Sequence, residues 1–127
     1  MHDFCIELEE HPENLASIGE LLGAAGVNIN GLSITNFEGR DVIHLVVDDA
    51  GPATRALKDS GVDICEVSEV FVLDKDRKNI TGKAGNFGAI CRTLADNGIR
   101  VRFGYPAENN RFVFGVDDIA RTRELLG

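Results

Sequence analysis

Two stretches of the sequence carry residues that could bind a small carboxylate at the start of a helix. One of them, "TGKAGNFGA" at residues 81–89, contains Gly85, Asn86 and Phe87, which would offer backbone N–H groups to a ligand. Glycine lets a ligand approach the backbone closely, and Lys83 adds a positive charge. Because a helix N-terminus has unpaired N–H groups and a partial positive charge, this stretch predicts a carboxylate-binding site.

The matching stretch nearer the N-terminus, "EEHPENLAS" at residues 9–17, has a different charge. Its candidate ligand-binding residues are His11, Asn14 and Leu15. Three carboxylates surround them: Glu9, Glu10 and Glu13. Since these would repel a ligand carboxylate, we expect one competent and one degraded site. The structural alternative is that Glu13 complements the helix dipole and that Asn14 and Asn86 serve as helix N-caps.

Two pairs of polar residues follow the two helices. Asn28 and Asn30 lie two positions apart on an expected strand, so their side chains share a face, and Arg100 and Arg102 occupy the matching positions. If the two halves of the chain pair side by side, the asparagines would face the 81–89 loop and hydrogen-bond a ligand bound there. The arginines would face the acidic loop and bridge to its glutamates. The alternative is a solvated polar face on an edge strand.

The chain also repeats itself. The segment "NLASIGELLGAAGVNI", residues 14–29, is echoed by "NFGAICRTLADNGIRV", residues 86–101, at a constant offset of 72. In each copy apolar residues recur at helical spacing up to a glycine, Gly26 or Gly98, which predicts a helix with a glycine C-cap. Later matches, such as "TRAL" and "TREL", come at a shorter offset, as loop deletions in a duplicated unit would produce. Chance likeness between two amphipathic helices is the alternative.

The expected elements come in the order βαββαβ. The first copy has strand patterns in "DFCIELEE", "VNINGLSI" and "DVIHLVVD", a turn at Glu38-Gly39, and a second helix between Pro52 and Gly61. We expect the run "VDICEVSEVFVLD" to be one long strand that closes the first sheet and opens the second. This order predicts a ferredoxin-like α+β fold repeated in tandem, with helices on one face of antiparallel sheets and the second copy lacking its last strand. The expected units are residues 1–69 and 70–127.

Charge and a bare sheet edge both favour association. Residues 1–74 hold 15 acidic and 3 basic residues, whereas residues 75–127 hold 6 acidic and 10 basic residues. Opposite signs suit docking of the halves on each other or on a second copy, although solvated faces of unequal charge are the alternative. A second sheet without its last strand would have a bare edge. Because bare edges pair with other chains, we expect a homodimer.

The segment "LLGAAGVNI", with Pro12 ahead of its helix, resembles the ACT domain, and the two copies look like the free-standing tandem ACT-domain proteins. The resemblance implies a regulatory module that binds a free amino acid between the loop entering the first helix of one unit and the second strand of its neighbour. It also implies allosteric coupling to a regulated enzyme or transcription regulator. The Pro-Gly entrance typical of the family is split here, with Pro12-Glu13 in the first copy and Ala84-Gly85 in the second.

Composition and motifs argue against other classes. No apolar run approaches about 18–20 residues and the N-terminus is acidic, which predicts a cytoplasmic protein without a membrane segment. A net charge of −8 argues against a nucleic-acid partner. The spacing in "GKAGNFG" disfavours a dinucleotide site, and the three histidines and three cysteines form no catalytic or metal motif. We therefore expect neither a cofactor nor enzymatic activity. The alternative function is a ligand-free protein–protein interaction module, followed by a ferredoxin-like enzyme of unknown chemistry.

Overall fold

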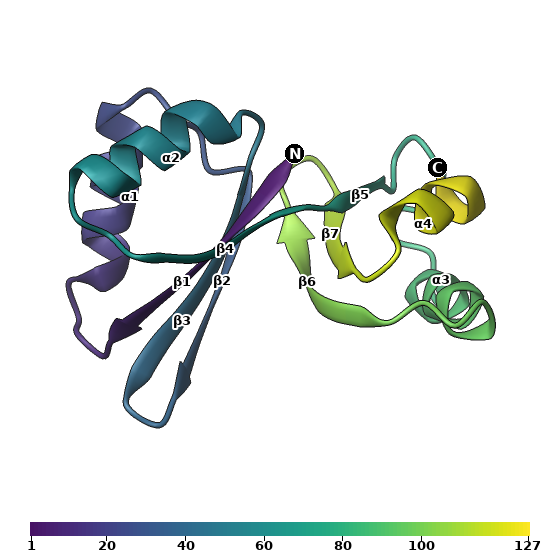
Figure 1. Ribbon diagram of the computed structural model, residues 1–127. Helices are drawn as coiled ribbons and strands as arrows, with labels where there is room; N and C mark the ends of the chain where they lie inside the picture. The colour runs from purple at the N-terminus through teal and green to yellow at the C-terminus, as the bar shows by residue number, and fades with distance from the viewer. The chain divides into compact units, whose positions relative to one another are not determined.

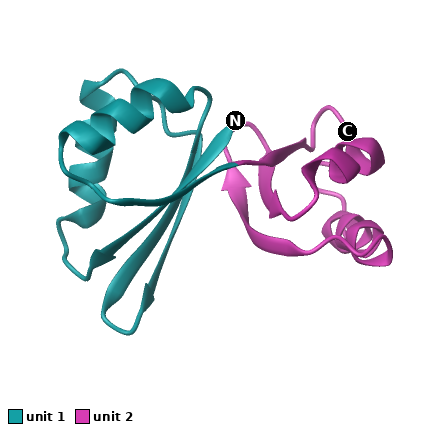
Figure 2. Ribbon diagram, in the orientation of Figure 1, with its two compact units in different colours: residues 1–68 teal, residues 69–127 magenta.

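The computed structural model describes all 127 residues, which form two compact units, residues 1–68 and 69–127 (Figure 2). Each unit contains its own sheet and its own pair of helices (Figure 1). The predicted α+β class and ferredoxin-like layout are confirmed. None of the four helices is both long enough and apolar enough to cross a membrane.

The first unit follows the order βαββαβ. Its elements are β1 (His2–Glu9), α1 (Asn14–Ala24), β2 (Gly31–Phe37), β3 (Arg40–Val47), α2 (Ala50–Asp59) and β4 (Ile64–Glu69). The strands are ordered β2-β3-β1-β4, and β3 runs antiparallel to both β1 and β2. Alternation along β1 buries Phe4 and Ile6, and the helical spacing of Ile18 and Leu22 on α1 completes the same core.

The second unit repeats the order βαββα. Its elements are β5 (Phe71–Asp74), α3 (Asn86–Asp96), β6 (Val101–Ala107), β7 (Arg111–Val116) and α4 (Ile119–Leu126). The sheet order is β5-β7-β6, with both pairs antiparallel. Its core joins Phe71 and Leu73 of β5 and Phe114 of β7 to Ile90 and Leu94 of α3.

The first helix of each unit ends in the same way. After α1, Gly26 adopts φ +73° and the Val27 N–H donates to the Leu22 carbonyl at 2.9 Å. After α3, Gly98 adopts φ +69° and the following N–H donates to the Leu94 carbonyl at the same distance. Both are Schellman caps, which need a residue that tolerates the left-handed conformation. The predicted glycine caps are therefore confirmed.

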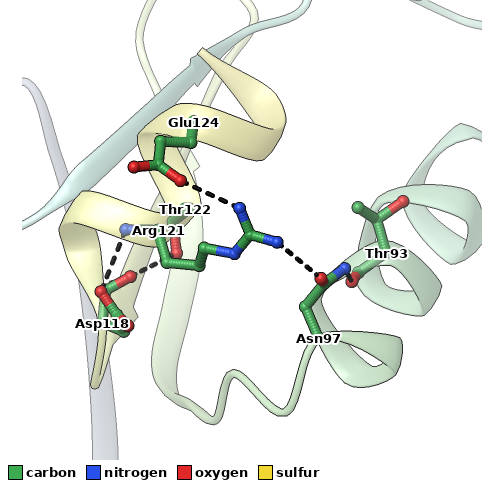
Figure 3. A network of polar contacts seen from close by, with 6 residues as sticks. All are labelled: Thr93, Asn97, Asp118, Arg121, Thr122 and Glu124. Atoms are coloured by element: carbon green, nitrogen blue, oxygen red, sulfur yellow. Dashed lines mark hydrogen bonds and ion pairs between the residues drawn. The ribbon is translucent and has the colours of Figure 1, made fainter.

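A polar network holds the end of α3 to α4 (Figure 3). Arg121 donates to Glu124 Oε2 at 2.9 Å and to Asn97 Oδ1 at 3.2 Å. Asn97 in turn donates to the Thr93 carbonyl at 2.8 Å. Asp118 caps α4 by accepting from the Arg121 N–H at 3.0 Å. The Arg121 guanidinium thus links the end of α3 to α4.

Three strand boundaries differ from the sequence prediction. The run expected as one long strand forms β4 and β5, which belong to different sheets and are separated by Val70 alone. The second strand of each unit starts later than expected, so Asn28 and Asn30 precede β2 and Arg100 precedes β6. The segments before β2 and β6 alternate polar residues with single apolar ones. Such a pattern does not determine the residue at which hydrogen bonding to the neighbouring strand begins.

Candidate functional site

The entrance to α3 is an open loop that leads into an uncapped helix. Gly85 is the N-cap residue, has φ +84°, and has no side chain to accept from the first turn. The first helical i→i−4 bond runs from Ala89 N–H to the Gly85 carbonyl at 3.1 Å. The N–H groups of Phe87 and Gly88 therefore precede the regular ladder and have no capping side chain. These are the donors that a ligand carboxylate would use.

Asn86 shapes this entrance and does not cap it. It is the first helical residue, and its side-chain Nδ2 donates back to the Ile80 carbonyl at 2.7 Å. Its backbone N–H makes a long contact to the Lys83 carbonyl at 3.4 Å. The N-cap interpretation of Asn86 is therefore wrong, because the amide reaches the incoming loop instead of the first helical turn.

An aromatic surface lies beside the uncapped turn. Phe87 is 52% exposed, although its ring packs against Phe112 at 5.2 Å between centroids and against Phe114 at 6.2 Å. Phe112 and Phe114 contact each other at 4.8 Å and anchor the ring to β7. Phe87 thus presents an apolar surface next to the uncapped first turn of α3.

The loop that leads into α3 is ordered by its own carboxylate. Asp76 accepts hydrogen bonds from Thr81 Oγ1 and from Asn110 Nδ2, the latter at 3.3 Å. These donors, Thr81 foremost, hold the pKa of Asp76 below its ordinary value. Lys75, Arg77, Lys78 and Lys83 make the same loop predominantly basic.

At the entrance to α1 the side-chain hydrogen bonds converge on a buried carboxylate, Asp41. Asn14 Nδ2 donates to the Glu9 carbonyl at 2.8 Å and also to Asp41 Oδ2 at 2.9 Å. The other oxygen of Asp41 accepts from Asn36 Nδ2 at 3.3 Å. These two side chains, together with the backbone N–H of His11, hold the pKa of Asp41 below its ordinary value. Glu13 is the N-cap residue and makes no side-chain cap, so the capping interpretation of Asn14 is also wrong.

A shallow groove of about 310 Å³ lies at this first entrance. It is lined by Glu10, His11, Pro12, Leu15, Ile34 and Asp41. The imidazole Nδ1 of His11 accepts the Glu13 N–H at 3.1 Å, so the histidine fixes the entering loop. Asp41 is only 7% exposed and lines this groove with a negative charge. Such a charge would repel a ligand carboxylate placed beside it.

Asp41 and Phe112 each lie near the start of the third strand of their own unit, on the face that carries the helices. Each is the second residue of the strand that follows the hairpin turn, and in the sheet register Asp41 faces Leu8 while Phe112 faces Leu73. One unit thus has a carboxylate under its helix entrance, and the other has an aromatic ring. The sequence prediction missed both residues, and a residue-by-residue comparison of the two hairpins was the signal that could have found them.

The two polar pairs are placed differently from the prediction. Asn28 is exposed and donates its Nδ2 to Asn30 Oδ1 at 3.3 Å, whereas Asn30 is buried and its N–H donates to the Val46 carbonyl at 2.9 Å. The register of β6 shifts between Val101 and Phe103, so Arg102 lies at a bulge and strand alternation no longer relates it to Arg100. The Arg102 guanidinium lies 5.9 Å from the centre of the Phe103 ring.

A histidine, a carboxylate and a thiol lie on the other face of the first sheet. His44 Nδ1 and Asp3 Oδ2 are 2.9 Å apart, and Cys5 faces His44 in the β1–β3 register. Burial raises the pKa of the Cys5 thiol to about 11, and the nearby Cys65 adds to the rise. Cys5 is therefore protonated at neutral pH and a poor nucleophile. Cys65 is exposed.

No protein-family model and no curated protein matches the chain. Solved structures match nearly its whole length. Protein BT0572 from Bacteroides thetaiotaomicron has a TM-score of 0.81 at 21% identity, with 98% of this chain and 85% of that chain covered. The regulatory subunit of aspartate kinase from Thermus thermophilus, in its ligand-free form, has a TM-score of 0.72 at 13% identity, with 98% and 87% covered.

A third match is the regulatory subunit of aspartate kinase from Thermus flavus. It has a TM-score of 0.64 at 12% identity, with 98% of this chain and 88% of that chain covered. The chain shares the fold of these proteins. Two of the three are regulatory subunits.

Proposed function

We propose that the protein is a regulatory module, without catalytic activity of its own, that binds a free amino acid at the entrance to α3. The observation that carries the proposal is the uncapped first turn behind Gly85, which lies in a basic loop and beside the exposed ring of Phe87. The α-carboxylate would accept from the Phe87 and Gly88 N–H groups, and the ring would contact the ligand side chain. Arrangements of this kind bind carboxylates because both the donors and the helix dipole are already in place.

The two units would then have different roles. The entrance to α1 keeps Asp41 where the ligand carboxylate would lie, so we infer a single competent site in each chain. His11, Asn14 and Leu15 belong to the degraded site. The expectation that Asn28 and Asn30 contact the ligand, and that Arg100 and Arg102 face the acidic loop, remains a prediction.

The regulatory mechanism would be linkage. An amino acid that binds one arrangement of the protein more tightly shifts the population toward it, and a partner enzyme or transcription regulator that recognises this arrangement responds. The ACT-like sequence pattern and the fold shared with two aspartate kinase regulatory subunits support this role. We also propose that the functional form is a homodimer.

A thermal-shift screen against the twenty amino acids tests the proposal. A ligand at about 100 times its dissociation constant adds about 2.7 kcal/mol of stability, which is measurable in a small domain. We expect a clear rise in Tm for one chemical group of amino acids. If all twenty leave the Tm unchanged, the protein is instead a ligand-free interaction module, and its sheet edges and charge asymmetry become the relevant features.

A further inference from the structure

The loop that leads into α3 is longer than its counterpart in the first unit. Four residues, 10–13, separate β1 from α1, whereas eleven residues, 75–85, separate β5 from α3. A longer connection loses more conformational entropy when it is ordered. The entrance to α3 therefore depends more than the entrance to α1 on contacts that restrain its incoming loop.

Both units join this loop to their hairpin turn by the same kind of backbone bond. In the first unit the Glu10 N–H donates to the Gly39 carbonyl at 2.9 Å, and in the second the Lys75 N–H donates to the Asn110 carbonyl at 3.1 Å. Gly39 immediately precedes β3, and Asn110 immediately precedes β7. Gly39 has no side chain with which to bind the loop further, whereas Asn110 has one.

The side chain of Asn110 reaches a carboxylate in the loop. Its Nδ2 lies 3.3 Å from each of the two oxygens of Asp76, and Asp76 Oδ1 also accepts from Thr81 Oγ1. Asn110 adopts φ +56°, a conformation that asparagine tolerates better than most residues. One carboxylate therefore joins the β6–β7 turn, residues 108–110, to the middle of the loop.

From Thr81 the contacts continue to the first turn of α3. The preceding residue, Ile80, packs against the core of the second unit, and its carbonyl accepts from Asn86 Nδ2 at 2.7 Å. Asn86 is the first residue of α3 and directly precedes Phe87. The contacts thus run from the turn through Asp76 to the residue beside the proposed carboxylate donors.

We propose that the β6–β7 turn regulates the binding site at the entrance to α3, with Asn110, Asp76 and Thr81 as positioning residues. This inference rests on the proposed function, because it concerns the same site. The apparent affinity of a site is proportional to the fraction of molecules in which the site has its binding arrangement. A substitution or a partner that separates the turn from Asp76 therefore weakens amino-acid binding without touching the ligand.

The test uses variants of the turn in the full chain. Asn110→Gly removes the amide that binds Asp76 and keeps the backbone conformation, because glycine adopts a positive φ readily. Asn109→Gly is the matched control, since Asn109 has φ +62° and the side-chain donors to Asp76 are Thr81 and Asn110.

A second pair of variants removes the other donor. Thr81→Val replaces the hydroxyl that binds Asp76 by a methyl group and keeps the branched shape. Thr93→Val is its matched control, because the Thr93 hydroxyl donates to the Ala89 carbonyl at 3.1 Å on the exposed side of α3. Circular dichroism checks that each variant folds.

The first readout needs no ligand. In the ¹⁵N-labelled chain, Asn110→Gly should shift the amide signals of Phe87 and Gly88, whereas Asn109→Gly should leave them in place. The signals report the arrangement of the donors themselves. A variant that only loosened the turn would move signals near residues 108–110 and not those of α3.

The second readout is calorimetric titration with the member of the twenty-amino-acid panel that gives the largest rise in Tm. Asn110→Gly and Thr81→Val should each weaken binding by about fivefold, as expected for one exposed hydrogen bond to a charged group. The two control variants should bind like the wild type. Asp76→Ala should weaken binding at least as much, and adding Asn110→Gly to it should have no further effect, because both act through the same carboxylate.

Asn110→Gly and Thr81→Val proteins that bind as tightly as the wild type would overturn the inference and leave the proposed function intact. An equal loss in Asn109→Gly, or a further loss when Asn110→Gly is added to Asp76→Ala, would do the same. If Asn110→Gly does not fold, the comparison of Thr81→Val with Thr93→Val decides. A wild type that binds none of the twenty amino acids would overturn the proposed function and, with it, this inference.

Discussion

The two helix entrances are built on the same backbone plan and differ in what lies beneath the first turn. Both α1 and α3 begin with an asparagine whose side chain bonds a carbonyl of the incoming loop, Glu9 in one unit and Ile80 in the other. In the first unit the asparagine also bonds Asp41, whereas in the second the ring of Phe87, next to the asparagine, packs against Phe112. The difference teaches that two units with the same fold can place different chemistry beneath the same helix turn, a carboxylate in one and an aromatic ring in the other.

The largest effect is expected when a carboxylate like that of Asp41 is introduced at the entrance to α3. Phe112→Asp would place a negative charge beneath the entrance to α3, as Asp41 lies beneath α1, and would remove the ring that supports Phe87. We expect amino-acid binding to weaken by about a hundredfold or more, or about 2.7 kcal/mol. Titration calorimetry measures it, and Phe112→Leu is the control that keeps an apolar side chain. Equal losses in both variants would show that packing, not charge, distinguishes the entrances.

A smaller loss is expected when the shape of the α3 entrance is changed without adding charge. Gly85→Val puts a β-branched residue at φ +84°, which strains or remodels the loop although nothing lies within 4 Å of the new Cβ. Binding should weaken by at least about tenfold. Gly98→Val is the matched control, since Gly98 has φ +69° and equally open space at the far end of the same helix. Normal binding by Gly85→Val would place the site elsewhere.

A substitution at the entrance to α1 should change the stability of the protein and not its affinity for the amino acid. Asp41→Asn removes the negative charge to which Asn14 and Asn36 both donate hydrogen bonds. The two amide donors then face a weaker, neutral acceptor. We expect Tm to fall by a few degrees and the affinity for the amino acid to stay the same. Asp63→Asn, at an exposed carboxylate in the loop before β4, is the control and should leave Tm unchanged. A gain of ligand binding in Asp41→Asn would sharpen the comparison by showing that Asp41 alone closes the site.

The smallest effect concerns pH. Asp41 and Asp76 have folded-state pKa values below their ordinary 3.8, because side-chain donors favour the carboxylate form. The unfolded chain then binds more protons, so their contribution is present above pH 3.8 and is lost as pH falls below it. Urea unfolding should therefore show that the stability difference between wild type and Asp41→Asn shrinks in acid. A difference that stays constant with pH would contradict the role of the charge.

The helices, the glycine C-caps of α1 and α3 and the fold class could be predicted from the sequence. Apolar spacing on α1 and α3 and the glycines that follow them are local signals, and local hydrogen bonds satisfy them. The positions of Asn30 and Arg100 could not be predicted in the same way. Where a strand starts depends on which neighbour it pairs with, and the bulge at Arg102 arises only in the β6–β7 pair.

The role of Asp41 at the entrance to α1 could not be predicted, because its hydrogen bonds join distant parts of the chain. Asp41 is bonded by Asn14 across 27 positions, and the sequence around Asp41 shows only a charged residue after a turn. The prediction that the first entrance is degraded rested on Glu9, Glu10 and Glu13. In the structure the hydrogen-bonded carboxylate at the first turn is Asp41.

The asymmetry between the entrances is tested most directly by an NMR titration. The uniformly ¹⁵N-labelled full chain is titrated with the amino acid that gives the largest thermal shift. The account predicts that the amide signals of Phe87 and Gly88 move with saturation, while those of Leu15 and Ala16 at the start of α1 do not. Saturable movement at Leu15 and Ala16, or none at Phe87 and Gly88, would contradict it.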